Sequence, residues 1–379
     1  MSLYDRSRST TDWQCPRRRY WTYEHLGRGI VPDITLMALY MGTAIHDGLA
    51  AIAHFHKDKD EVDIDLIATT AQKQMYDALI ETDDSFENMQ FANEQSRLVE
   101  GMLRGFYRQV WPGLMQSYPN ILAIEQEMTY IHDNNGLKSE KGPHCFMAKP
   151  DLVIGNDNGD NFYIEYKSTS TKKPDWIHSW DTAIQLHSTC KAIEATLNIP
   201  VTGVIVQGLY KGYSSYGKQS SPFCYAYHRP GEPPFIKEQT SYAYKAGFKK
   251  YPTWELEGGL KKWVENMPED MLADQFPQTP PIFIKEDIVQ AFFAQRGLRE
   301  TEIDMAMEML KASNGDEEVV KAILNTAFPQ KFDQCSPAFG SLCPDKVLCH
   351  GCISDPLTSG FQLRESHHQL EADKHAKKV

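Results

Sequence analysis

The feature that most constrains the fold is a pair of apolar segments separated by a polar turn. The segments are CFMAKPDLVIG at 145–155 and FYIEYKST at 162–169, and NDNGDN at 156–161 lies between them. Aromatic and β-branched residues favour strands, and Asn, Asp and Gly tolerate the positive φ of a tight turn. We therefore predict a β-hairpin whose two strands lie in the core.

The second strand of this hairpin carries two charged residues in an apolar run. Glu165 and Lys167 are two residues apart, so they project from the same face of the strand. The hairpin brings Asp151 close to Glu165, and two carboxylates repel each other unless a cation lies between them. Oxygen ligands suit Mg²⁺ or Mn²⁺. Two interpretations follow: a metal site with Lys167 beside the metal, or an exposed acid–lysine cluster worth under about 1 kcal/mol.

The rest of the chain predicts an α/β fold. Helices are expected at 34–55, over most of 62–117, at 181–197 and, with breaks near Gly297 and Asn314-Gly315, over 285–327; strands are expected at 121–130 and 201–210. The order helix, strand, hairpin, helix, strand predicts a central mixed sheet flanked by helices. It has a helical N-terminal part and a Cys-rich C-terminal segment.

Composition narrows the class of protein. The chain has 379 residues, 41% of them apolar, which is enough for one large domain with insertions. A net charge of −12 weighs mildly against nucleic acid, but basic residues cluster locally, as at Lys261-Lys262. The first residues have no apolar core, and the apolar stretch 34–45 is too short to span a bilayer. We expect a cytoplasmic protein without a membrane partner.

Four cysteines gather near the C-terminus, and one lies near the start of the chain. They are Cys335, Cys343, Cys349 and Cys352, together with Cys15. Among these spacings, only that between Cys349 and Cys352 is typical of zinc sites. A structural zinc site is therefore one interpretation of the C-terminal group. The remaining cysteines fall in apolar contexts, where we expect core packing.

These motifs resemble the PD-(D/E)xK nuclease superfamily, in particular its RecB-like branch of CRISPR-associated and phage exonucleases. KPD at 149–151 and EYK at 165–167 are similar to the motif that gives the superfamily its name. Further segments resemble RecB-like nucleases in the family's order: CPRRRYWTY at 15–23, MGTAIHDGL at 41–49, QLHSTCKAIEA at 185–195 and CPDKVLC at 343–349. The resemblance covers most of residues 12–352.

The resemblance implies a role for each residue that matches a motif. Asp151, Glu165 and Lys167 would be catalytic, and the metal ligands would be Asp151, Glu165, the backbone carbonyl of Tyr166, His46 and Glu125. Taken alone, His46 is as easily a core histidine on an apolar helix face. Glu125 is favoured over Glu127 because it directly follows the apolar run. Gln185 would contact DNA, although Thr189 stands where the family has a tyrosine, which weakens this assignment.

The resemblance also implies a second interpretation of the cysteines. Cys15, Cys335, Cys343 and Cys349 would bind a 4Fe–4S cluster, since thiolates suit such clusters. The gap after Cys335 is longer than is usual in the family, so Cys352 is an alternative to Cys335. Zinc remains the competing metal.

The function implied is that of a DNA exonuclease that depends on Mg²⁺ or Mn²⁺ and acts on ends or single strands. The host would be a bacterium or a phage-infected cell, and any helicase or recombination partner would be a separate chain, since no P-loop is present. The alternative is a non-catalytic DNA-binding or scaffold protein that retains the fold. We expect a nuclease core at 12–278, a helical insertion at 279–330, a metal-cluster segment at 331–352 that closes onto the N-terminus, and a disordered tail at 353–379.

Overall fold

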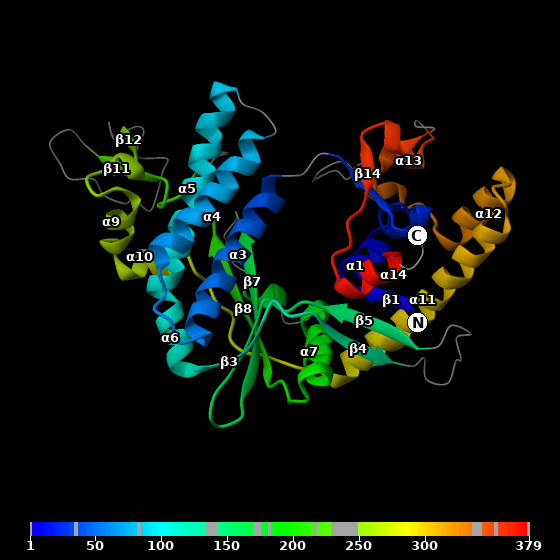
Figure 1. The fold of residues 1–379 in the computed structure, drawn as a ribbon, viewed down its shortest axis with the longest axis horizontal. Coiled ribbons are helices and arrows are strands. Elements are labelled where there is room, and N and C mark those ends of the chain that lie inside the picture. The colour runs from blue at the N-terminus through cyan, green and yellow to red at the C-terminus, as the bar shows by residue number, and fades with distance from the viewer. Residues whose placement is uncertain are drawn as a thin grey trace.

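A five-stranded mixed sheet forms the centre of the protein (Figure 1). The structure is a computed structural model that describes residues 2–33, 37–81, 85–132, 143–169, 176–180, 183–211, 213–215, 218–228, 249–335, 343–351 and 355–376. The strand order is β13-β8-β7-β6-β3. The strands span Ile282–Phe283 (β13), Gly203–Tyr210 (β8), Asn161–Thr169 (β7), Leu152–Gly155 (β6) and Asn120–Ile124 (β3).

The predicted hairpin is confirmed in β6 and β7, which pair antiparallel with Leu152 opposite Ile164. The side chain of Asn156 accepts hydrogen bonds from the backbone N–H groups of Asn158 and Asp160, each at 3.0 Å. Gly159 completes the turn at φ +86°, a conformation that glycine adopts without strain. Strand β7 then pairs parallel with β8, so the sheet is mixed as expected.

Helices cover both faces of this sheet. Ile154 and Ile164 pack into one apolar cluster with the first helical group, and Val153 and Tyr163 pack into another with α7 (Ile184–Leu197). The alternation of β6 and β7 thus buries both faces. The first helical group comprises α3 (Met37–Lys57), α4 (Ile64–Ile80), α5 (Phe86–Gln109) and α6 (Trp111–Ser117).

A second sheet corrects two predicted strands. It has the order β1-β5-β4, with β1 at Ser2–Asp5, β5 at His144–Ala148 and β4 at Met128–His132. The predicted strand 121–130 splits at Glu125, whose φ of +42° breaks the extended backbone. The predicted strand 145–155 splits before Pro150, which has no N–H group for a ladder. Each predicted strand therefore contributes to both sheets.

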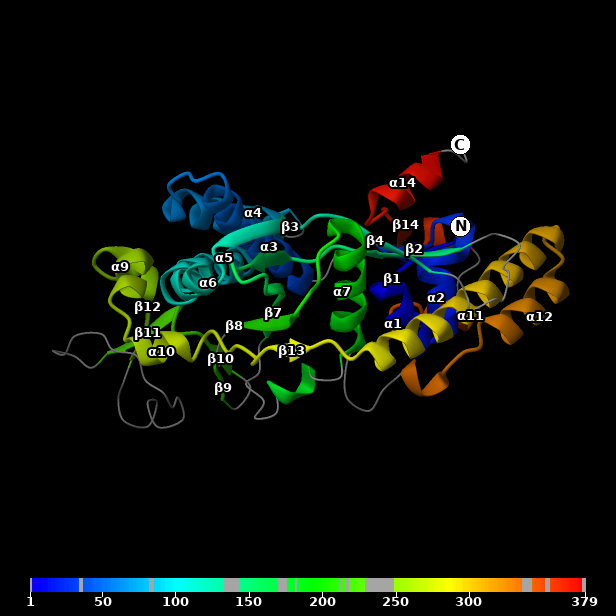
Figure 2. The same cartoon turned by 90° about the horizontal axis from the view of Figure 1, so that it is seen from below.

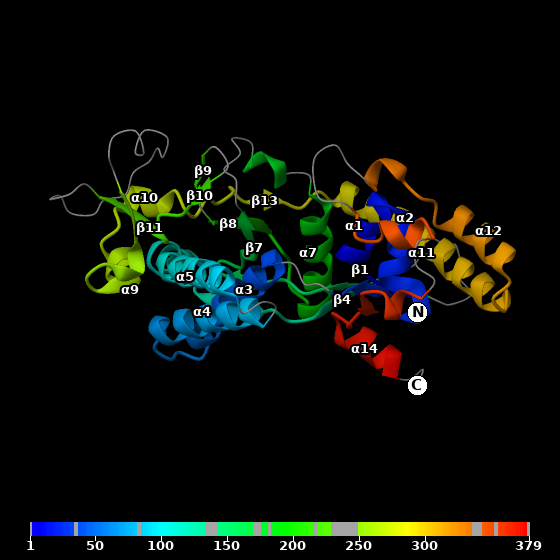
Figure 3. The ribbon, with the colours of Figure 1, turned by 90° about the horizontal axis from the view of Figure 1, so that it is seen from above.

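The helical segment near the C-terminus is longer and less broken than predicted. Helix α11 (Glu286–Ala312) continues through the buried Gly297, and it ends before the turn that leads to α12 (Glu317–Ala327). One glycine costs a helix only about 1 kcal/mol, and the packing of α11 outweighs this cost. Both helices lie beside α1 (Arg6–Gln14) and α2 (Pro16–Arg19), as Figures 2 and 3 show.

The expected disordered tail is wrong for residues 355–376. Strand β14 (Phe361–Leu363) pairs with β2 (Ile30–Pro32), and α14 (Gln369–Ala376) follows. The physical reason is burial: Phe361 packs on Ile30, and the buried carboxylate of Glu371 accepts hydrogen bonds from Arg8 and Arg364. The polar composition of the tail concealed this packing because Ile30 and Arg8 lie in the N-terminal segment.

The remaining elements are short and lie at the periphery. They are β9 (Tyr213–Ser215), β10 (Lys218–Ser220), β11 (Tyr225–His228), β12 (Lys249–Pro252), α9 (Gly259–Glu265), α10 (Glu269–Ala273) and α13 (Lys346–Cys349). Within the described part of the chain, no helix combines the length and apolar character needed to cross a membrane.

Candidate metal centre

The hairpin holds Asp151 against the neighbouring strand. Asp151 immediately precedes β6, and its Oδ2 accepts a hydrogen bond from the backbone N–H of Tyr166 at 2.7 Å. Glu165 and Lys167, on either side of Tyr166, form an ion pair with each other. The predicted proximity of these three side chains therefore follows from the register of two paired strands.

Helix α3 contributes an imidazole to the same place. The Nδ1 atom of His46 lies 3.1 Å from Asp151 Oδ1 and 4.0 Å from Glu125 Oε1. One ligand atom from each of these three residues lies within 4.8 Å of the others. Carboxylate oxygens and an imidazole nitrogen suit a divalent ion such as Mg²⁺ or Mn²⁺. The donor set of the described residues thus fits such an ion.

Glu125 reaches this group because the chain turns sharply between β3 and β4. Its backbone N–H donates to the carbonyl of Asp151 at 3.1 Å, and its Oε2 pairs with Lys149 Nζ at 2.7 Å. Glu127, the other glutamate of this segment, instead accepts from the backbone N–H of Gln369 at 2.8 Å. The structure therefore places Glu125 at the centre and Glu127 against α14.

Glu165 lies beside the three-residue group rather than in it. Its Oε1 binds Lys167, and it also accepts a hydrogen bond from Arg6 Nη1 at 3.0 Å. Sequence reasoning missed Arg6, which lies 159 positions earlier in the chain and belongs to no matched motif. The short segment before Cys15 gave no local signal for this contact.

Burial and neighbouring charges set the protonation behaviour of the centre. Burial raises the pKa of Asp151, and the Glu165 carboxylate raises it further. Burial also favours a raised pKa at Glu165, but Lys167 and Arg6 outweigh it and hold that pKa below its usual value. Burial alone lowers the pKa of His46, whereas the adjacent Asp151 raises it above the usual value. Two buried acids whose pKa values are shifted in opposite directions, next to a histidine, are typical of a functional site.

Four cysteines of the predicted cluster are described, and pairs of them lie near enough to affect each other's pKa. The pKa of the Cys349 thiol is raised to about 12, first by burial and then by Cys15 and Cys343 among its neighbours. Burial raises the pKa of Cys343 as well, and Cys335 adds to this effect. These thiols are all free. Cys352 lies outside the described residues.

Within the described ranges, no three of these thiols come as close together as the ligand atoms of His46, Glu125 and Asp151.

Gln185 lies in the first turn of α7 and lines a cavity of about 340 Å³ together with Arg6. Thr189, at the family's tyrosine position, is buried and its hydroxyl donates to the Gln185 carbonyl at 2.8 Å. The helix thus uses Thr189 internally and presents Gln185 to the cavity.

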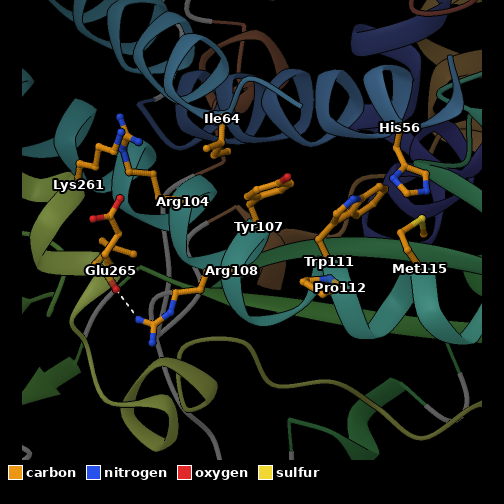
Figure 4. Close-up of a pocket in the computed structure, with 11 residues that line it drawn as sticks. His56, Ile64, Arg104, Tyr107, Arg108, Trp111, Pro112, Met115, Lys261 and Glu265 are labelled. Carbon is orange, nitrogen blue, oxygen red and sulfur yellow. Dashed lines mark hydrogen bonds between the residues drawn. The ribbon is translucent and has the colours of Figure 1, made fainter. Parts of the chain in front are cut away.

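A larger cavity of about 540 Å³ lies between α5, α6 and α9 (Figure 4). Its cations already have partners: Arg104 and Lys261 bind Asp65, and Arg108 donates to the carbonyls of Val264 and Met267. Because His46, Glu125 and Asp151 do not line it, this cavity is separate from the candidate centre.

Comparison with known protein families gives one relevant match. The family model of the PD-(D/E)XK nuclease superfamily matches residues 7–280. This span contains His46, Glu125, Asp151, Glu165 and Lys167, and it ends before α11. No curated protein matches the chain in sequence.

Proposed function

The chain belongs to the PD-(D/E)XK nuclease superfamily, and on this premise we propose that it is a metal-dependent DNA exonuclease. The observation that carries the proposal is the convergence of His46, Glu125 and Asp151 on one point, with Glu165 and Lys167 beside it. The likeness to RecB-like exonucleases of phage and CRISPR systems in motif order supports action on DNA ends or single strands.

Each residue of the centre has a distinct task in this proposal. Asp151, Glu125 and His46 would hold the divalent ion, with Glu165 and the Tyr166 carbonyl completing its shell. The ion, when bound, supplies an activated water and stabilises charge on the phosphate. The Lys167 Nζ would orient the attacking water and face the negative charge that develops on the phosphate oxygens. Tyr166 fixes Asp151 through its backbone N–H, so the acid is already oriented.

The cysteines would bind a 4Fe–4S cluster that ties the two ends of the chain together. Cys15 and Cys349 come from opposite ends of the chain, yet Cys15 is near enough to raise the pKa of the Cys349 thiol. This proximity supports the proposal. Arg17 strengthens the same junction, since its guanidinium donates to the Phe328 carbonyl at 2.8 Å and to Asn325 at 2.9 Å. The cluster would be structural, since the metal centre lies on other elements.

The biological setting proposed is the cytoplasm of a bacterium or of a phage-infected cell. A separate helicase or recombination protein would supply unwound DNA. The scaffold alternative is a protein that keeps the fold without catalysis. It requires that Asp151, Glu165 and Lys167 are all present but have no chemical role.

A nuclease assay tests the proposal directly. Anaerobically purified protein is incubated with Mg²⁺ or Mn²⁺ and with single- and double-stranded DNA labelled at the 5′ or 3′ end. We expect stepwise shortening from one end, and a loss of at least about 100-fold in Lys167→Ala and Glu165→Ala. Lys261→Ala, an exposed lysine of the separate cavity, is the matched control and keeps full activity.

Cutting by both site variants at the wild-type rate would disprove the site assignment. DNA binding without any cutting by the wild-type protein would favour the scaffold alternative. Internal cleavage of a circular substrate would replace exonuclease by endonuclease action.

A further inference from the structure

The cavity that contains Gln185 lies directly beside the candidate metal centre and is not used in the mechanism above. Its walls come from α1, α7, α11 and the turn at His178–Trp180. Arg6 connects it to the centre, because this arginine lines the cavity and also donates to Glu165 at 3.0 Å. The lining includes Arg6, Ser9, Trp13, Trp180, Gln185 and Ser188.

One side of the cavity has the features of a phosphate site. The Arg6 side chain is 39% exposed, so its guanidinium retains free donors besides the one that binds Glu165. Helix α7 begins at this cavity with Ala183 at its N-cap and no side-chain cap. Uncapped N–H groups and the positive end of a fourteen-residue helix favour an anion.

The other side has the features of a base site. Trp13 is 44% exposed, and its ring is held by an edge contact with Phe292 at 5.8 Å. Trp180 is likewise held by an edge contact with Trp176 at 5.8 Å. Both rings line the cavity. The two indole rings therefore offer this cavity the aromatic surface on which a base can stack.

We propose that this cavity binds one unpaired nucleotide, with its phosphate on Arg6 and the start of α7 and its base against Trp13 and Trp180. The inference rests on the proposed function, which makes DNA the substrate, and it names a subsite of that substrate. Nucleic-acid bases stack on tryptophan regardless of their sequence, which suits a nuclease that reads no sequence. Because Arg6 touches Glu165, the bound phosphate lies next to the metal centre.

Binding is measured without metal, in EDTA, so that no DNA is cut. The probes are a fluorescein-labelled ten-residue oligo(dT), a blunt duplex of the same length and free dTMP. We expect Trp13→Ala to weaken oligo(dT) binding about tenfold, with little change for the duplex. Phe332→Ala, an exposed aromatic residue outside the cavity (67% exposed), is the control and binds normally.

Arg6→Gln gives a second readout that does not depend on Trp13. Losing one phosphate contact should make the slope of log Kd against log salt shallower by about 0.7. A purely structural role of Arg6 would leave this slope unchanged. Competition by dTMP would identify a free mononucleotide as a ligand, and binding of oligo(dT) alone would identify a strand; both support a nucleotide site.

Unchanged oligo(dT) affinity in Trp13→Ala together with an unchanged salt slope in Arg6→Gln overturns the proposal. If the wild-type protein cuts DNA in Mg²⁺ while these variants bind normally, only the subsite fails. If the wild-type protein binds oligo(dT) through this cavity but cuts nothing, the subsite stands and the nuclease proposal fails.

Discussion

Replacing Glu300 by alanine tests whether buried charges join α11 to the N-terminal segment. The Glu300 carboxylate is 3% exposed, and its Oε2 accepts from Arg19 Nη2 at 3.0 Å while its Oε1 accepts from Arg296. Three guanidiniums of this region face four carboxylates: Arg19, Arg296 and Arg299 against Asp12, Glu24, Glu300 and the exposed Glu302. Alanine at position 300 removes one carboxylate partner from each of the buried guanidiniums of Arg19 and Arg296.

The magnitude follows from what the two arginines retain. Removing one partner of a buried ion pair costs about 3–5 kcal/mol of folding free energy. Arg19 keeps Glu24 at 2.9 Å and Arg296 keeps Asp12 at 2.9 Å, so we expect the lower end of that range, about 3 kcal/mol. With a urea dependence of about 3 kcal/mol per molar, the unfolding midpoint should fall by roughly 1 M.

Urea titrations followed by far-UV circular dichroism and by tryptophan fluorescence measure this shift. The control is Glu302→Ala, two residues along the same helix: Glu302 is 66% exposed and pairs with Arg299 at 3.0 Å. An exposed pair contributes under about 1 kcal/mol, so this midpoint should move by less than about 0.3 M. Equal midpoints for the two variants would refute the role of Glu300.

Two further predictions concern the same end of the molecule. Burial alone raises the pKa of Asp12, but hydrogen bonds from Arg299 and Arg296 outweigh it and hold the pKa below 3.8. The stability from this acid is therefore complete above its unfolded pKa of about 3.9 and is lost as the pH falls through the lower folded value. Asp12→Asn should flatten the dependence of Tm on pH in that window, and an unaltered slope would contradict the assignment. Cys15→Ser should remove the broad visible absorbance expected of anaerobically purified protein, whereas the core variant Cys145→Ser should keep it; a colourless wild-type protein with one equivalent of zinc would exclude the cluster.

The central sheet could be predicted from the sequence because its signals are local. The turn residues at 156–161 and the apolar strands around them act within about twenty positions, and the alternation of 162–169 fixes which side chains share a face. The spacing of Glu165 and Lys167 predicted their shared face, and the hairpin predicted that Asp151 lies near them. The prediction of His46 as a ligand depended on the family resemblance, since nothing in the local sequence distinguishes a ligand histidine on an apolar helix from a core histidine.

Other features depend on partners that sequence patterns do not reveal. The turn at Glu125 arises from a backbone φ of +42° in a residue that usually avoids it, so the alternation suggested one strand instead of two. Arg6 and Glu371 occupy polar segments whose only local signal is charge. Their partners lie 159 and 363 positions away, which is why a tail expected to be disordered is folded.

The contact between Arg8 and Glu371 has a consequence for the order of folding. The hairpin and helices α3–α5 lie in the first half of the chain, and the three helices pack on one another, so this part can begin to form early during synthesis. Pairing of β1 with β5 holds the start of the chain, whereas the contact of Arg8 with Glu371 must wait for the C-terminal segment, and contacts so distant in sequence form slowly. During synthesis, the acids around His46 therefore come together before the buried guanidinium of Arg8 gains its partner Glu371.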